Sequence, residues 1–180
     1  MDAPDILRLE FATLPDVIRA HARAQPDRAA LIHGGRRFDY SALGDEVNIA
    51  SRLEGSSKQF GVDIVASAAT RDEAPEFAWL EIDSVLLKNK TRPVGLYALA
   101  GGAAVAASGE FAALSRLHSA MLAAYRNRDF AGAISMAGEA AGRAPEAVRG
   151  LYSYNLRRFS QLADTAQDAD WRPLIALDEK

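Results

Sequence analysis

The chain has 180 residues, of which 49% are hydrophobic, and a formal net charge of −3, which together indicate one folded domain or a domain with a small appendage. The negative charge argues against nucleic-acid binding, and the lack of cysteine excludes disulfides, thiolate nucleophiles and cysteine-ligated zinc. Because no run of about 18 apolar residues occurs, we expect no membrane segment and a cytoplasmic location.

The first 40 residues predict a helix followed by a hairpin. Leu14 to Ala24 carries apolar residues at helical spacing, and Gln25-Pro26-Asp27 ends that pattern. Ala29 to His33 and Arg36 to Tyr40 predict two strands. Gly34-Gly35 lies between them, where both residues can adopt the positive φ that a two-residue hairpin turn needs.

A second helix is predicted to begin at Asp45, because a short acceptor side chain after Gly44 can bond the free amides of a first turn. Gly61 is the expected end of this helix. Four apolar residues of the helix are candidates for the core: Val47, Ala50, Leu53 and Phe60.

Two polar residues of this helix, Asn48 and Arg52, are four positions apart and therefore lie one above the other. An amide and a guanidinium that project together suit an anionic ligand, because the guanidinium offers several donors in a rigid fork. On spacing alone, an ordinary solvated helix face is the better explanation of the pair, because helix surfaces commonly carry such residues.

The middle of the chain predicts strands. Val62 to Ser67 is a strand, Thr70 to Glu76 is a turn or short helix, and Phe77 to Leu87 alternates as a half-buried strand does. Lys88-Asn89-Lys90 is the expected turn, and Pro93 to Leu99 is the last strand. The core side of the alternating strand carries Ala78, Leu80 and Ile82.

A Gly/Ala-rich linker from Ala100 to Gly109 precedes three predicted helices, at Glu110–Arg128, Phe130–Ala141 and Pro145–Leu162. Gly142 and Pro145 are the stop and start signals between the last two helices. The spacing of apolar residues in the three helices predicts core positions at Leu114, Leu117, Met121, Tyr125, Phe130, Ala133, Ile134, Ala137, Val148, Leu151, Tyr152 and Phe159.

The segment Arg37–Gly55, RFDYSALGDEVNIASRLEG, resembles the signature of class III adenylate/guanylate cyclases. The resemblance implies that Asn48 orients the ribose and that Arg52 meets the charge developing on the phosphates. Ser41 falls where the family places a base-reading residue. Lys88 and Lys90 match the turn whose lysine contacts the triphosphate, although a solvated hairpin tip is an equal alternative for them.

The same resemblance implies Mg²⁺ or Mn²⁺, which neutralises the triphosphate and activates the ribose 3′-hydroxyl. In the family, two aspartates upstream of the signature hold the metals, and this chain has no counterpart of them. Asp39 lies at the wrong place in the motif, and Asp45 is interpreted as a helix cap. We therefore expect no metal ligands here and no activity from this chain alone. ATP would bind in a site shared between two subunits, in a homodimer or with a complementing cyclase subunit.

The resemblance covers residues 36–180 and implies an α+β fold. Residues 36–100 would form part of a ferredoxin-like cyclase domain, 101–109 a linker, and 110–180 a helical extension. The pair of helices from Glu110 to Ala141 resembles a tetratricopeptide unit, and one such unit does not form a solenoid alone. Packing or partner contact is the role expected of these helices.

Residues 1–35 form a separate predicted segment. Leu14–Ile18, Gln25–Ile32 and Gly34–Leu43 resemble the N-terminus of an acyl-CoA synthetase or related AMP-forming ligase, but no Ser/Thr/Gly-rich phosphate loop ending in lysine follows. Three hypotheses result. The first is a catalytically incomplete cyclase fragment, the second is a non-enzymatic helical interaction module, and the third is a ligase remnant.

Overall fold

The computed structural model describes residues 14–33, 36–40, 47, 50, 53, 55–86, 93–165, 167–168 and 170–175. The chain divides into two compact units, Met1–Arg52 and Leu53–Lys180, and each is considered by itself. Together their elements are α+β, as predicted. The ferredoxin-like and tetratricopeptide-like assignments and the predicted domain boundaries stay predictions.

The N-terminal unit contains one helix and one antiparallel pair of strands. Helix α2 (Leu14–Ala24) is followed by β1 (Ala29–His33) and β2 (Arg36–Asp39). The amide of Gln25 donates to the carbonyl of His21 where α2 ends, and the ring of Tyr40 stacks on the His21 imidazole at 4.7 Å. The predicted helix and both strands are confirmed, while the Gly34-Gly35 turn lies outside the described residues.

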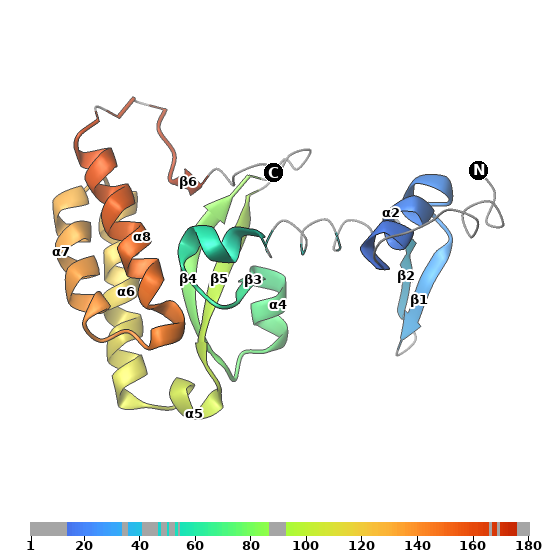
Figure 1. Cartoon of the computed structure of the whole chain (residues 1–180), viewed down its shortest axis with the longest axis horizontal. Coiled ribbons are helices and arrows are strands. Elements are labelled where there is room, and N and C mark those ends of the chain that lie inside the picture. Colours follow the sequence, from blue (N-terminus) through green and yellow to red (C-terminus); the bar gives the residue numbers. More distant parts are fainter. Residues whose placement is uncertain are drawn as a thin grey trace. The chain divides into compact units, whose positions relative to one another are not determined.

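The second unit combines a mixed sheet with three long helices (Figure 1). Strand order is β3-β5-β4-β6; β5 is antiparallel to β3 and β4, and β6 is parallel to β4. Its labelled elements are β3 (Val65–Ser67), α4 (Ala68–Glu73), β4 (Ala78–Val85), β5 (Val94–Gly101), α5 (Ala103–Ala106), α6 (Gly109–Arg126), α7 (Phe130–Ala141), α8 (Glu146–Ala163) and β6 (Leu174–Ile175).

Local capping explains where the long helices begin and end. The Ser108 hydroxyl accepts from the amide of Phe111 at the start of α6, and the Asp129 carboxylate accepts from the amide of Gly132 at the start of α7. Gly142 ends α7 and Pro145 precedes α8, as predicted. The predicted linker contains the end of β5 and the short helix α5.

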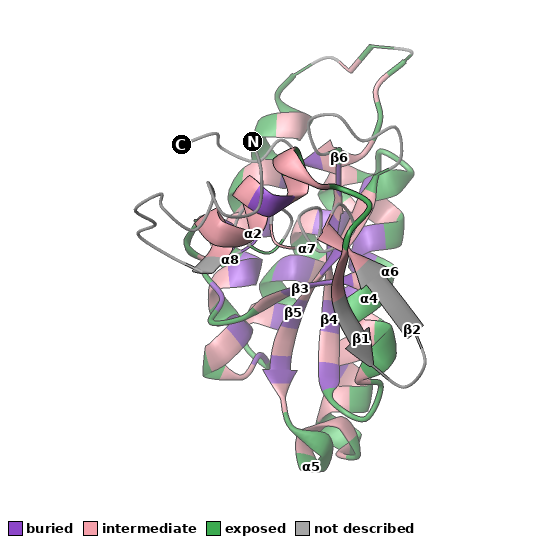
Figure 2. Cartoon of the chain, turned by 90° about the vertical axis from the view of Figure 1, so that its right-hand side faces the viewer, coloured by how far each residue is buried: buried purple, intermediate pink, exposed green. Residues whose placement is uncertain are grey.

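The helices bury the sheet on one side, with α6 packed against β4 and α8 against β5, while α7 packs on both helices. Figure 1 shows α6, α7 and α8 side by side next to the strands, and Figure 2 shows buried positions along β4 and β5. Helices and sheet therefore share a single core within this unit. In the ranges given above, every helix falls short of the length and apolar character that a bilayer-spanning segment requires.

The register of β4 contains a β-bulge that changes which residues face the core. Leu80 pairs with Ala98 and Asp83 pairs with Leu96, so Ile82 is the extra residue between them. Residues that lie directly opposite each other on neighbouring strands point to the same face of the sheet. Ala98 and Leu96 are two positions apart on β5 and therefore also point to one face. Asp83 therefore lies on the same buried face as Leu80, where simple alternation places it on the opposite face.

The predicted core is largely confirmed. Of the core positions predicted in the helix that begins at Asp45, Leu53 and Phe60 are buried, but Ala50 is exposed and Val47 is only half-buried, so the prediction for Ala50 was wrong. The other predicted core positions that are fully buried are Ala78, Leu80, Ile82, Leu114, Met121, Tyr125, Ala133, Ala137, Val148, Leu151, Tyr152 and Phe159.

Three predicted core positions of the helical segment, Leu117, Phe130 and Ile134, are half-buried. On α6 the adjacent residue, His118, is buried at 2% exposure. The imidazole enters the core because the main chain of β4 and a tyrosine of α8 offer it two hydrogen bonds, which Leu117 has no means to form.

Two glycines, Gly61 and Gly150, allow α8 to approach the turn at residue 61 closely. Gly61 has φ 65° and ends the helical run 55–60 as predicted; its amide donates to the carbonyl of Lys58, and the amide of Val62 donates to that of Ser57. This pattern is a Schellman motif, which favours glycine at the left-handed position. A Cβ added to Gly150 on α8 would lie 2.8 Å from the Cα of Gly61.

We predict that Gly150→Ala lowers the free energy of unfolding by about 1–3 kcal/mol, because the new methyl group meets the main chain of Gly61. The matched control is Gly138→Ala in α7, where nothing beyond the chain neighbours and the backbone of the helix itself lies within 4 Å of the added Cβ. That change removes backbone freedom from the unfolded chain and raises stability by about 0.5–1 kcal/mol. Urea unfolding followed by circular dichroism measures both, and effects of the same sign would contradict the close packing.

Candidate functional site

The residues proposed from the cyclase resemblance all lie outside the described residues: Ser41, Asn48, Arg52, Lys88 and Lys90. The structure describes their neighbours. Val47, Ala50 and Leu53 are helical, and Val85 pairs with Val94, so the two strands on either side of the lysines are adjacent in the sheet.

The polar centre of the second unit is the carboxylate of Asp83, which is 1% exposed. It accepts a hydrogen bond from Arg158 on α8 at 2.8 Å and lies 3.7 Å from the guanidinium of Arg126 on α6. Arg126 also pairs with Glu81 at 2.5 Å. Two carboxylates of β4 thus meet two guanidinium groups, and the four formal charges of this Asp83 cluster cancel. A buried carboxylate is tolerated only with such partners.

The hydroxyl of Tyr125 also accepts a hydrogen bond from Arg158, whose guanidinium carbon lies 4.7 Å from the centre of the ring. Burial raises the pKa of the Tyr125 hydroxyl above its ordinary value, so the group stays protonated. Its ring stacks on Phe159 at 4.9 Å and meets Trp171 edge-on at 5.6 Å. The aromatic contacts hold the segment after α8 against α6.

His118 joins α6 to both β4 and α8. Its Nε2 lies 2.6 Å from the carbonyl oxygen of Glu81, and its Nδ1 lies 3.1 Å from the hydroxyl of Tyr152. Because a carbonyl only accepts, Nε2 carries the proton and Nδ1 accepts from the tyrosine. Burial lowers the pKa of the imidazole; the nearby Glu81 opposes the shift and Arg126 adds to it. His118 is therefore a neutral structural link.

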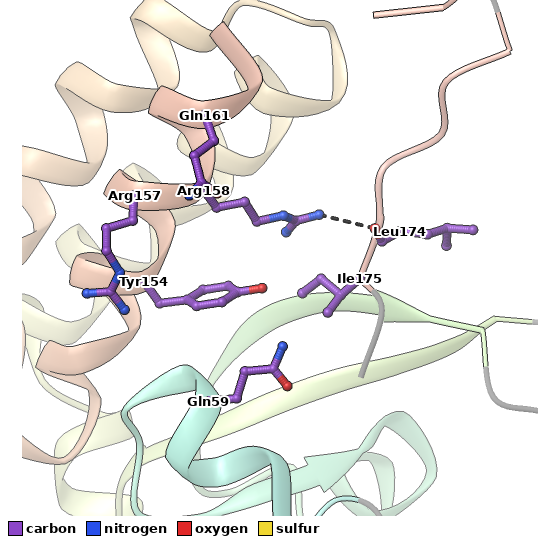
Figure 3. Close-up of a pocket in the computed structure, with 7 residues that line it drawn as sticks. All are labelled: Gln59, Tyr154, Arg157, Arg158, Gln161, Leu174 and Ile175. Carbon is purple, nitrogen blue, oxygen red and sulfur yellow. Dashed lines mark hydrogen bonds between the residues drawn. The ribbon is translucent and has the colours of Figure 1, made fainter. Parts of the chain in front are cut away.

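A cavity of about 360 Å³ lies between α8, the strand β6 and the helical run 55–60 (Figure 3). The Arg158 guanidinium donates to the carbonyl oxygen of Leu174 at 3.5 Å across one side of it. The residues that line the cavity are Gln59, Tyr154, Arg157, Arg158, Gln161, Leu174 and Ile175. The cavity combines amide, hydroxyl and guanidinium donors with an apolar wall.

The described residues do not fit a Mg²⁺ or Mn²⁺ site. Within the ranges that the structure describes, no three His, Asp or Glu side chains converge. Asp83, the most buried carboxylate among them, is already paired with Arg158 and lies near Arg126.

The Asp83 cluster, His118 and the cavity were not predicted from the sequence. Asp83 and Arg158 are 75 residues apart, and His118 and Glu81 are 37 apart, so no local spacing connects them. One local signal was available. An aspartate in the apolar run AWLEIDSV is costly to bury and therefore indicates a partner elsewhere in the chain.

Comparison with known proteins finds a partial match to Adenylate cyclase 1 of Rhizobium meliloti (strain 1021), which is 32% identical over 66 residues. The match covers 36% of this chain and 10% of the length of that relative. No family model matches the chain, and no solved structure matches it. The comparisons thus support a distant relationship to a cyclase and lend no support to the ligase resemblance.

We predict that Asp83→Asn lowers the free energy of unfolding by on the order of 3 kcal/mol, because the charge of Arg158, 15% exposed, then lacks its carboxylate. The control is Glu139→Gln, which breaks the exposed pair with Arg143 and changes stability by less than about 1 kcal/mol. Urea unfolding at neutral pH measures both. Equal effects would show that the buried pair contributes no more than a surface pair.

We predict that His118 makes a pH-dependent contribution to the free energy of unfolding. Its pKa in the folded state lies below the ordinary 6.5, so the unfolded chain binds a proton more readily. The contribution is complete above pH 6.5 and is lost as the pH falls below it, by at most about 1.4 kcal/mol per pH unit. His118→Gln should flatten the dependence of unfolding free energy on pH below that value. An unchanged slope would show that His118 titrates alike in both states.

Proposed function

We propose that this chain supplies the substrate-positioning half of a nucleotidyl cyclase site that converts ATP to cyclic AMP and pyrophosphate. The observation that carries the proposal is the 32% identity over 66 residues with an adenylate cyclase, together with the signature segment Arg37–Gly55. The order of elements after that segment adds support, because the antiparallel pair β4 and β5 flanks the two lysines of the predicted turn.

In the proposed reaction, the ribose 3′-hydroxyl loses its proton to solvent and its oxygen forms a bond to the α-phosphorus. The bond from that phosphorus to the bridging oxygen breaks, and pyrophosphate leaves. Asn48 holds the ribose so that its 3′-oxygen approaches the phosphorus, a positioning role that lowers the barrier. Arg52 offers guanidinium donors to the phosphate oxygens, where negative charge increases in the transition state. Lys88 and Lys90 bind the triphosphate, and Ser41 contacts the base.

The proposal requires a second subunit. When bound, Mg²⁺ or Mn²⁺ neutralises the triphosphate and lowers the pKa of the 3′-hydroxyl. As the cyclase resemblance implies, the carboxylates that would hold the metal come from a complementing cyclase subunit. The proposed active species is thus a mixed dimer, in which this chain contributes Asn48 and Arg52.

We predict that the purified chain alone makes no cyclic AMP from Mg-ATP or Mn-ATP. Mixed with a full-length class III cyclase whose own Asn and Arg are replaced by alanine, it should restore cyclic AMP production. Asn48→Ala and Arg52→Ala should each reduce the restored rate by about 100-fold or more, since each removes a contact to the transition state. Cyclic AMP formed over time is the measurement.

Arg116→Ala, an exposed position of α6, is the matched control and should leave the restored rate unchanged. Restored activity that survives both Asn48→Ala and Arg52→Ala would overturn the proposed roles. A folded, monomeric chain with no nucleotide affinity and no restored activity would instead favour the helical interaction module.

A further inference from the structure

The cavity beside α8 is formed by segments that are far apart in the sequence. Gln59 comes from the helical run before β3, Tyr154 from α8 and Ile175 from β6. Figure 3 shows Gln59 and Tyr154 extending toward Ile175, with Arg157 beside Tyr154 on the opposite side from Ile175. At about 360 Å³ the cavity falls within the usual range of small-molecule sites.

The walls of the cavity are held by contacts on several sides. β6 pairs with the end of β4, and the carbonyl of Leu174 accepts from Arg158. Trp171 meets Phe130 edge-on at 5.8 Å, just before β6. On the other side, the ring of Tyr154 meets Phe60 edge-on at 5.2 Å. The cavity is therefore formed before any ligand arrives, which reduces the entropy lost on binding.

The charge balance of the lining is positive. The seven lining residues include no carboxylate. Arg158 is neutralised by Asp83. Arg157 takes no part in the ion pairs formed among the described residues, and its side chain is exposed at the rim. One guanidinium thus remains to attract an anion into a cavity with further amide and hydroxyl groups.

We propose that this cavity binds a small organic anion with a planar body. The carboxylate or phosphate group of the ligand contacts Arg157, and the planar body lies along the ring of Tyr154 toward the apolar side chain of Ile175. The amide of Gln59 hydrogen-bonds the polar edge of the ligand. This site shares no residue with the proposed cyclase site, so the two proposals stand or fall separately.

The test uses the full ¹⁵N-labelled chain and follows amide chemical shifts during ligand titrations. Benzoate and AMP are the anionic probes, benzamide and adenosine are their neutral counterparts, and inorganic phosphate is an anion without a planar body. We expect benzoate or AMP to shift the amides of Gln59, Tyr154 and Ile175 in a saturable way, and binding by the neutral counterparts to be at least about 10-fold weaker. Whether benzoate or AMP binds more tightly distinguishes a carboxylate site from a phosphate site.

Arg157→Ala should weaken binding of the anionic probes by about 10-fold or more, because it removes the charge-assisted contact. Arg116→Ala removes an exposed arginine of α6 that does not line the cavity, and it should leave the affinity unchanged. The proposal is overturned if neither anion shifts these amides, if the neutral counterparts bind as tightly, or if Arg157→Ala binds like the unsubstituted chain.

Discussion

The buried carboxylate of Asp83 is the constraint on which the second unit depends. Removing a carboxylate from water costs several kcal/mol unless charged partners surround it. Here Arg158 and Arg126 come from α8 and α6, so the requirement to neutralise one side chain of β4 fixes the position of both helices on the sheet. Arg158 also bonds Leu174, and the same guanidinium therefore fixes the strand β6.

Elements defined by local signals were predictable, and contacts defined by distant partners were not. The helices at 14–24 and 130–141 matched their predicted bounds because apolar spacing and end signals such as Gln25-Pro26-Asp27 and Gly142 lie within a few residues. The bulge at Ile82, which turns Asp83 inward, depends on the register with β5. His118 replaced Leu117 in the core because its partners come from β4 and α8, and periodicity carries no information about either.

The proposed cyclase site has a different basis. Composition and spacing alone left Asn48 and Arg52 as an ordinary helix face, and only the similarity of many consecutive residues indicated a transition-state role. The fold adds the adjacency of β4 and β5 on either side of the lysines. It also shows Asp83, the buried carboxylate of β4, in an ion pair with Arg158 of α8.

The strand β6 links the core to the cavity. It supplies two lining residues of the cavity, and it is held by pairing with β4 and by Arg158. A ligand that binds only when β6 is paired with β4 stabilises this strand pairing by mass action. By reciprocity, pairing of β6 raises the affinity for the ligand by the same factor by which the ligand favours the pairing. Because Arg158 contacts both Asp83 and β6, a weakened Asp83 pair would also reduce ligand affinity. Core stability and cavity binding in this unit are therefore coupled through one guanidinium.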